Sequence, residues 1–255
     1  MILVIRGHIR ETFFTRNFYD LIKNISNTIP DLKIFIHTWN IISNNISWRN
    51  IKQNNTIVTE ETIYNYFGDL KHLIKHIIID DDTKVKLIGN LRGKINKSSM
   101  PIIGWKYYWY GKFQIINYIN NQNTDNNNIY DNEMIINLRF DVLNNSHSLS
   151  HDFIMRFINY YIIKYNDNII VSNLFIKQSP CNGIDNIYIG NIYTLYKLTE
   201  KFYNNFTDII LKNPKIRNQE WLVFIVNYEL FNNKLQFNLF NHKTLENNIS
   251  KMIIL

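Results

Sequence analysis

Residues Ile2-Leu-Val-Ile-Arg6 form a continuous apolar run, which is typical of a strand buried in a parallel sheet. From about Thr12 to Asn27 the apolar residues recur at spacings of three and four, which predicts a helix that ends before Pro30. Asp31-Leu-Lys-Ile-Phe-Ile-His37 then alternates as a second strand. A strand, a helix and a strand within about 40 residues indicate a βαβ unit with a right-handed crossover. This stretch therefore predicts an α/β fold with parallel strands.

The same alternation continues along the chain. Apolar runs predict two further strands, His76-Ile-Ile-Ile-Asp80 and Met134-Ile-Ile-Asn-Leu-Arg-Phe-Asp141. A short helix is expected after Thr59, a typical N-cap residue, and an aromatic-rich helix from Ile103 to about Asn121. Late in the chain we expect strands at Ile169–Ser172 and Asp185–Gly190, and helices at about 192–204 and 218–230. These elements predict a single domain with a mostly parallel sheet flanked by helices.

The composition excludes several classes of protein. With 45% hydrophobic and 19% charged residues, the chain has enough apolar surface to fold, which excludes intrinsic disorder. No apolar run approaches the roughly 20 residues that span a bilayer, so we expect no transmembrane segment and a cytoplasmic location. The single Cys181 excludes a disulfide framework or a thiolate-rich zinc site, and no nearby His supports it as a nucleophile.

The amino-acid usage points to the source and weakens the argument from charge. About one residue in six is Asn, a similar share is Ile, and Ala is absent. This bias indicates a very AT-rich coding sequence, of a giant DNA virus or an AT-rich microbe; a viral protein would act in the host cytoplasm. The net charge is 28 − 21 = +7, but the same bias favours Lys, and the lysines are scattered singly. We therefore expect no nucleic-acid partner.

Charged, polar or aromatic residues follow each of the four predicted strands. Ligands of open α/β sheets bind at the carboxyl ends of parallel strands, so these residues are candidates for a binding site. They are Arg6, His8 and Arg10 after the first strand, His37, Thr38 and Trp39 after the second, Asp80 to Asp82 after the third, and Arg139 and Asp141 after the fourth. Guanidinium groups bind phosphates, and a carboxylate can hold a divalent ion that itself binds phosphates.

Several sharper catalytic patterns are absent from the sequence. There is no Gly-rich phosphate loop and no Gly-x-Ser-x-Gly nucleophile elbow. His72 and His76 stand four residues apart, but an isolated pair of this kind is more often structural than metal-binding.

Three motifs occur in order along the chain: Arg6-Gly-His-Ile-Arg10, Asp31-x-x-Ile-Phe-Ile-His-Thr-Trp39 and Leu138-Arg-Phe-Asp141. Together they resemble a group of GT-A-fold glycosyltransferases that occur in bacterial capsule and lipopolysaccharide gene clusters and in giant viruses. The later Gly183-Ile-Asp-Asn-Ile-Tyr-Ile-Gly190 resembles a segment found late in such domains. The resemblance covers about residues 2 to 190. It implies one GT-A-like (Rossmann-like) domain, with a nucleotide-binding part at about 1–141 and an acceptor-side part at about 142–255.

The resemblance also implies an activity: transfer of a sugar from a nucleotide-sugar donor, UDP-linked by default, to a glycan or glycoprotein acceptor. Such enzymes usually hold Mn²⁺ or Mg²⁺ with an Asp-x-Asp element. Here Arg139 stands in place of the first carboxylate. Either Asp141 alone holds the ion through the donor phosphates, or Arg139 supplies part of the charge that a metal would bring to the leaving diphosphate. Asp80-Asp-Asp82 is a rival metal pair, or else a solvated turn.

Each implied site residue has a structural alternative. Donor contacts are expected from Arg6, His8, Arg10, His37, Thr38, Trp39, Arg139 and Asp141. Arg6 and Arg10 could instead be surface charges, and Trp39 could cap the core. Trp105 and Trp109 invite a role in sugar stacking, but their helical spacing favours the core, with Lys106 and Lys112 on the outer face.

An inverting transferase needs a carboxylate base to take the proton of the acceptor hydroxyl. Asp185, expected in a loop just before a strand, is the first candidate, and a turn-forming Asp is its structural alternative. Glu220 is the reserve candidate, although a carboxylate at a helix start needs no catalytic explanation. Two other functions stay open: a nucleotidyltransferase that uses Asp80 to Asp82 for its metal, and a non-catalytic basic binding module with a degenerate glycosyltransferase fold.

Overall fold

The computed structural model describes most of the chain. It covers residues 1–47, 51–95, 100–125, 129–131, 133–144, 150–165, 173–177 and 182–216, together with 222–223, 225–226 and 229–230. Of residues 160–165, 173–177, 182–186 and 188 it describes the backbone alone. The predicted strand Ile169–Ser172, most of the predicted helix at 218–230, Cys181 and Glu220 lie outside the described residues.

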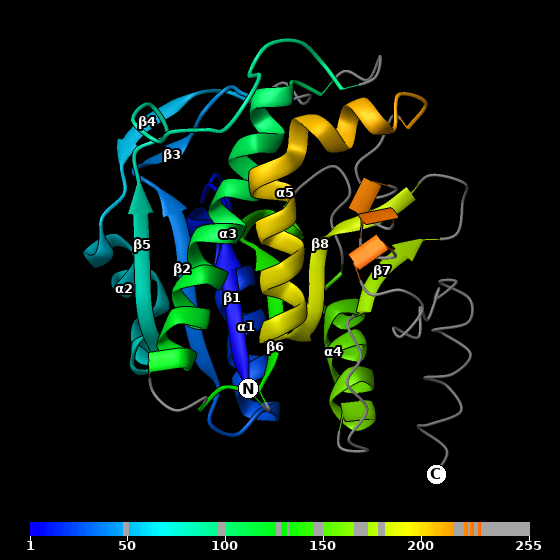
Figure 1. The fold of residues 1–255 in the computed structure, drawn as a ribbon. Coiled ribbons are helices and arrows are strands. Elements are labelled where there is room, and N and C mark those ends of the chain that lie inside the picture. The colour runs from blue at the N-terminus through cyan, green and yellow to red at the C-terminus, as the bar shows by residue number, and fades with distance from the viewer. Residues whose placement is uncertain are drawn as a thin grey trace.

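A six-stranded sheet in the order β5-β2-β1-β6-β8-β7 forms the centre of the molecule (Figure 1). Strand β1 pairs in parallel with β2 and β6, and β2 pairs in parallel with β5. Strand β8 is antiparallel to both of its neighbours. The strands are β1 (Ile2–Arg6), β2 (Lys33–Trp39), β5 (Ile74–Asp80), β6 (Met134–Arg139), β7 (Asn173–Lys177) and β8 (Asn182–Asn191). The predicted α/β class with a mostly parallel sheet is confirmed.

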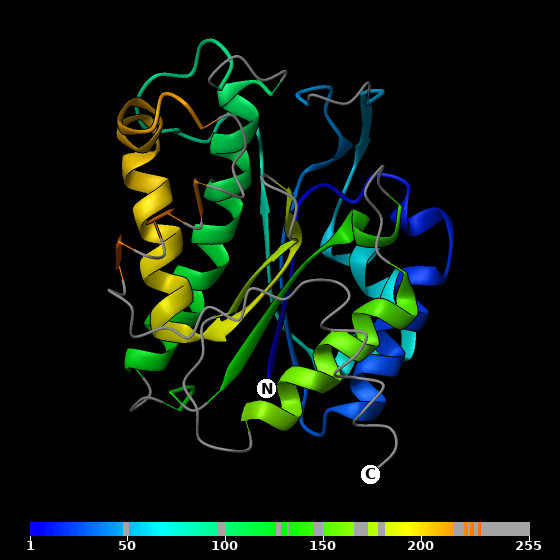
Figure 2. The ribbon, with the colours of Figure 1, turned by 90° about the vertical axis from the view of Figure 1, so that its right-hand side faces the viewer.

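Helices cover both faces of this sheet (Figure 2). Helices α3 (Ile102–Asp125) and α5 (Ile192–Lys212) lie on one face, and α1 (Asn17–Thr28), α2 (Glu60–Phe67) and α4 (His151–Tyr165) on the other. Because strand side chains alternate, Leu3 and Ile5 pack with α1, whereas Ile2 and Val4 pack under α3 and α5. Every residue of β1 is buried, which explains its uninterrupted apolar sequence.

The path of the chain creates a topological switch point between β1 and β6. Helix α1 carries the chain from β1 to β2 on one side, and α3 carries it from β5 at the sheet edge back to β6, on the other side of β1. In open α/β sheets the carboxyl ends of strands at such a point border the ligand crevice. A ligand site is therefore expected at the carboxyl ends of β1 and β6.

A local sequence signal explains where helix α2 begins. It starts after Thr59, whose hydroxyl accepts the backbone N–H of Thr62 while the Thr62 hydroxyl accepts that of Thr59.

Several elements differ from the prediction. The helix predicted from Thr12 is split into a 3-10 turn, η1 (Thr12–Phe14), and α1. Two further 3-10 segments are η2 (Gly68–Leu73) and η3 (Phe140–Leu143). Sequence reasoning missed α4, β7 and the hairpin of β3 (Ile41–Ser43) and β4 (Asn54–Ile57).

Helix α3 corrects one prediction and confirms another. Trp105 and Trp109 are buried core residues, and the Trp109 ring stacks on that of Phe202 of α5 with 3.9 Å between centroids. Lys106 and Lys112 were expected on the outer face, but both are buried. The reason is that α3 is covered by the sheet and by α5, so it has no broad solvent face.

Among the helices that the structure describes, none is long and apolar enough to span a bilayer.

Candidate functional site

Three cationic or ionisable side chains stand side by side where the central strands end. Arg6 of β1 is in register with His37 of β2 and with Arg139 of β6. By the alternation of the strands, all three belong to the face that α3 covers, as does Val4. The strand register thus brings together residues from all three motifs that resemble glycosyltransferases.

An inner cluster lies beneath α3 and consists of Arg6, Asn137, Tyr108 and Lys112. Arg6 makes two of its hydrogen bonds. Its Nε donates to Oδ1 of Asn137 at 2.7 Å, and its Nη2 donates to the Tyr108 hydroxyl at 3.0 Å. The Lys112 Nζ donates to the same hydroxyl at 2.6 Å and lies 4.0 Å from the Tyr108 ring centre and 4.3 Å from that of Trp109. Arg6 is 3% exposed and Lys112 2%. Two buried cations therefore share one tyrosine at the switch point, stabilised in part by aromatic faces.

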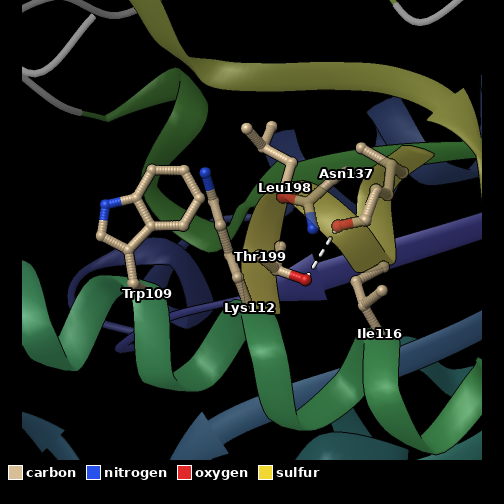
Figure 3. A pocket seen from close by; sticks show the side chains of 7 residues that line it. Trp109, Lys112, Ile116, Asn137, Leu198 and Thr199 are labelled. Carbon is tan, nitrogen blue, oxygen red and sulfur yellow. Dashed lines mark hydrogen bonds between the residues drawn. The ribbon is translucent and has the colours of Figure 1, made fainter. Parts of the chain in front are cut away.

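A small cavity lies beside Lys112 (Figure 3). Asn137 and Thr199 line it together with apolar side chains of α3 and α5, and its volume is about 10 Å³. The Thr199 hydroxyl donates to the carbonyl of Leu195 at 2.8 Å, which is the dashed line in Figure 3. Such a volume holds about one water molecule. The cavity is too small for a nucleotide or a sugar.

An outer cluster lies at the same edge and consists of Arg10, Asp141 and Arg139. The Arg139 Nε and Nη2 donate to the two carboxylate oxygens of Asp141, each at 2.8 Å. The Arg10 Nη1 donates to Oδ2 of Asp141. Their side chains are 20% exposed for Arg10, 12% for Arg139 and 5% for Asp141. Both oxygens of a buried carboxylate are thus bound by guanidinium groups, in the geometry that also suits phosphates.

The loop after β1 fixes the position of Arg10. The Gly7 N–H donates to the carbonyl of His37 at 3.1 Å, and the Thr38 hydroxyl donates to the carbonyl of Gly7 at 3.0 Å. The Arg10 N–H donates to the carbonyl of Ile42 at 2.9 Å. Arg10 has a φ of 54°, in the left-handed region that is costly for a residue with a Cβ. These bonds hold the strained backbone in place, and Thr38 acts here as a support for the loop.

The residues at Asp141 do not fit a divalent metal in this arrangement. Each oxygen of Asp141 accepts from a guanidinium group. A divalent ion at either oxygen would stand next to the positive charges of Arg10 and Arg139, which repel it. Across the described residues, no group of three or more His, Cys, Asp or Glu side chains could hold a metal.

The rival metal pair Asp80-Asp-Asp82 is also not assembled. Asp80, Asp81 and Asp82 each have a different partner: His37 Nε2 at 3.1 Å, the Thr83 hydroxyl at 2.6 Å and the Asn44 amide at 2.6 Å, respectively. The pKa of Asp81 is lowered to about 2, mainly by the hydrogen bond from the Thr83 hydroxyl. For Asp81, the interpretation as a turn residue is therefore confirmed.

Trp39 lies inside an aromatic cluster. It is buried, and its ring stacks with the rings of His8 and Tyr110 at centroid distances of 5.7 and 5.8 Å. His37 lies directly beneath α3 at Gly111, where an added Cβ would come within 2.7 Å of the imidazole. The structure therefore places Trp39 as a cap on the core, without a ring face turned to solvent for stacking on a base.

Burial and hydrogen bonds set the charges of the neighbouring groups. The pKa of His8 is lowered, chiefly because burial disfavours the imidazolium, and its Nε2 lies 3.8 Å from Oδ2 of Asp82, beyond hydrogen-bond distance. Partial burial acts to raise the pKa of Asp80, but the hydrogen bonds from His37 and Tyr110 and the electrostatic attraction of His37 together outweigh it, and the pKa is lowered. His8 is thus a neutral group next to ionised carboxylates.

The structure corrects the environment of the candidate base. Asp185 lies inside β8 and not in a loop before a strand. Ile187 pairs with Leu138 across the antiparallel ladder, so Asp185, two residues earlier, lies at the carboxyl end of β6, near the end that carries Arg139. The backbone of Asp185 thus lies at the same edge of the sheet as Arg139, and its role as the base stays a prediction.

Sequence reasoning missed three residues of the inner cluster. Asn137 interrupts an otherwise apolar strand, which is a recognisable sign of a buried polar contact. Tyr108 and Lys112 stand four apart on a helix, but this spacing alone does not distinguish a site from core packing.

Comparison of the sequence with known protein families found no match, and a comparison with curated proteins found none that is significantly similar. A functional proposal therefore rests on the fold and on the chemistry of this edge.

Proposed function

We propose that the protein is a glycosyltransferase that moves a sugar from a nucleotide-sugar donor, UDP-linked by default, to a glycan or glycoprotein acceptor. The observation that carries the proposal is the pair of guanidinium groups, of Arg10 and Arg139, that meet at the carboxyl ends of β1 and β6, next to the buried Arg6. This is the switch point of the sheet, where open α/β folds bind their ligands. Guanidinium groups there suit the diphosphate of such a donor.

The fold supports the same function. An antiparallel strand, β8, enters the sheet between β6 and β7, after a half built from parallel strands. This arrangement is compatible with a GT-A domain, whose nucleotide-binding half comes first. The three motifs that carry the resemblance are far apart in the sequence, yet Arg6, His37 and Arg139 are neighbours in the register. Their convergence is what a shared donor site requires.

The chemistry needs a cation and a base. The acceptor hydroxyl oxygen attacks the anomeric carbon, and the bond from that carbon to the diphosphate oxygen breaks. The electron pair leaves with the nucleoside diphosphate, whose developing charge the guanidinium groups of Arg10 and Arg139 stabilise. In an inverting reaction the acceptor proton goes to a carboxylate, for which Asp185 is the candidate.

The test is a turnover screen of the purified full chain. UDP, GDP and CMP sugars are incubated with mixed glycan acceptors, and release of free nucleotide is followed together with transfer of labelled sugar. We expect turnover of one donor class, and a loss of about 100-fold or more in Arg139→Ala, the scale seen when one stabilising donor to a transition state is removed.

The matched control is Arg156→Ala. Arg156 pairs with Asp152 on the exposed part of α4, so its removal deletes an arginine of the same type away from the site. We expect normal turnover in this variant. In a parallel incubation with nucleoside triphosphates and sugar 1-phosphates, release of pyrophosphate would instead indicate a nucleotidyltransferase. The absence of turnover with every donor would indicate a binding module.

A further inference from the structure

The charge at the carboxyl end of β6 differs from that of a metal-binding Asp-x-Asp element by two units. Replacing the first carboxylate of such an element by an arginine changes the charge at that position from −1 to +1. This difference equals the charge of one divalent ion. In this chain the arginine is Arg139, and it binds the remaining carboxylate, Asp141, through two hydrogen bonds of 2.8 Å.

We propose that the outer cluster is a metal-independent diphosphate site, in which Arg10 and Arg139 bind the diphosphate and Asp141 is a positioning residue. The identity of the anion as the diphosphate of a sugar donor rests on the proposed function. Asp141 holds the two guanidinium groups next to each other against their mutual repulsion. The formal charges of these three side chains sum to +1, and Arg6 is in register beside them.

Exposure and backbone geometry support this assignment. Asp141 is the most buried member of the cluster, whereas the side chains of Arg10 and Arg139 are 20% and 12% exposed, so the cations are the groups that a ligand in solvent can reach. The strained φ of Arg10 is held by the bond from its N–H to Ile42. Strain that the surrounding structure maintains is found preferentially at ligand sites, where it fixes a side chain before the ligand arrives.

The inference is tested by binding of inorganic pyrophosphate, which contains the shared diphosphate and needs no knowledge of the base or sugar. Calorimetry and thermal shift are run on the full chain in excess EDTA, and then with added Mg²⁺. We expect binding in EDTA and no gain in affinity with Mg²⁺, which itself complexes pyrophosphate in solution. Arg139→Ala is expected to lose at least about tenfold in affinity, because it removes charge-assisted hydrogen bonds.

Three further variants and one control make the assignment specific. Arg139→Asp restores the Asp-x-Asp pattern, and we expect it to lose binding in EDTA and to regain it with Mg²⁺. Arg139→Lys keeps the charge but not the two-pronged geometry, so an intermediate affinity is expected. Asp141→Asn keeps the shape and removes the charge that aligns the arginines; weaker binding with an unchanged circular dichroism spectrum is expected. Arg156→Ala is the control for general electrostatic attraction and should bind as the wild type does.

Three results would overturn the inference: binding of pyrophosphate only in the presence of metal, wild-type affinity in Arg139→Ala, or no binding under any condition. Failure of the proposed function looks different. If pyrophosphate binds in EDTA but no nucleotide sugar is consumed, the site stands and the transferase activity is wrong. If a nucleotide sugar is consumed only with added metal, the transferase stands and the metal-independent site is wrong.

Discussion

The inner and outer clusters hold similar cations in opposite ways. In the inner cluster, Arg6 and Lys112 are almost fully buried and share the Tyr108 hydroxyl and ring. In the outer cluster, Arg10 and Arg139 share the carboxylate of Asp141 and are partly exposed. Burial around an aromatic ring fixes a positive charge inside the fold. Pairing with a carboxylate at the sheet edge instead presents the charge to solvent, so we expect the inner cluster to serve stability and the outer cluster to serve binding.

The largest effect is expected from removing the carboxylate of the outer cluster. Asp141→Ala leaves two guanidinium groups close together with little water around them, and we expect a loss of about 3–5 kcal/mol in the free energy of unfolding. Urea unfolding measures this quantity. Asp152→Ala removes the partner of an exposed arginine and should cost at most about 1 kcal/mol. Equal losses in the two variants would show that the outer cluster is no more than a surface ion pair.

The comparison is sharpened by Tyr108→Phe, which keeps the ring but removes the hydroxyl that both inner cations use. We expect a loss of about 2 kcal/mol in stability, because hydrogen bonds to charged groups disappear. Pyrophosphate affinity should stay within twofold of the wild type. A large loss of affinity without a loss of stability would place the inner cluster in the binding site and break the distinction. Tyr193→Phe, at an exposed position, is the control.

A third prediction tests the close contact between α3 and the sheet, next to the inner cluster. Gly111→Ala adds a Cβ 2.7 Å from the buried His37 ring, so we expect a loss of about 1–3 kcal/mol from overpacking. Gly104→Ala meets the flexible end of Met100 at 3.0 Å and should be neutral or slightly stabilising, since Ala favours helices. Thermal unfolding compares the two. If Gly111→Ala is as stable as Gly104→Ala, the close approach at His37 is wrong.

The smallest effect concerns pH at the edge between the clusters. Because the pKa of His8 is lowered in the folded state, the unfolded chain takes up a proton first as the pH falls below about 6.5. Stability is then lost toward lower pH, by at most about 1.4 kcal/mol per pH unit from this group. The free energy of unfolding, measured at several values between about pH 7.5 and pH 5.5, should change less with pH for His8→Gln than for the wild type. His72→Gln, on an exposed segment, should leave the slope unchanged, and an equally steep His8→Gln curve would exclude His8 as the cause.

Much of the fold could be predicted because its signals are local. The apolar run of β1, the helical spacing in α1 and α3 and the cap at Thr59 depend on neighbouring residues only. The edge carrying Arg6, His37 and Arg139 was also predictable, because parallel strands end on one side of a sheet. Even at this edge, the surroundings of the individual residues were not predictable. Trp39 is buried between rings, and Asp185 lies within a strand.

The sequence by itself determined the α/β class, the positions of the main parallel strands along the chain and the set of charged residues at their carboxyl ends. Only the tertiary structure decided which of these charges meet. Arg10 and Asp141 are 131 residues apart in the chain, and no local pattern reports that they bind each other. Lys106 and Lys112 are buried because α5 packs over α3, a contact that their own helix does not encode. Periodicity fixes the direction of a side chain relative to its own element, but its partners depend on how distant elements pack.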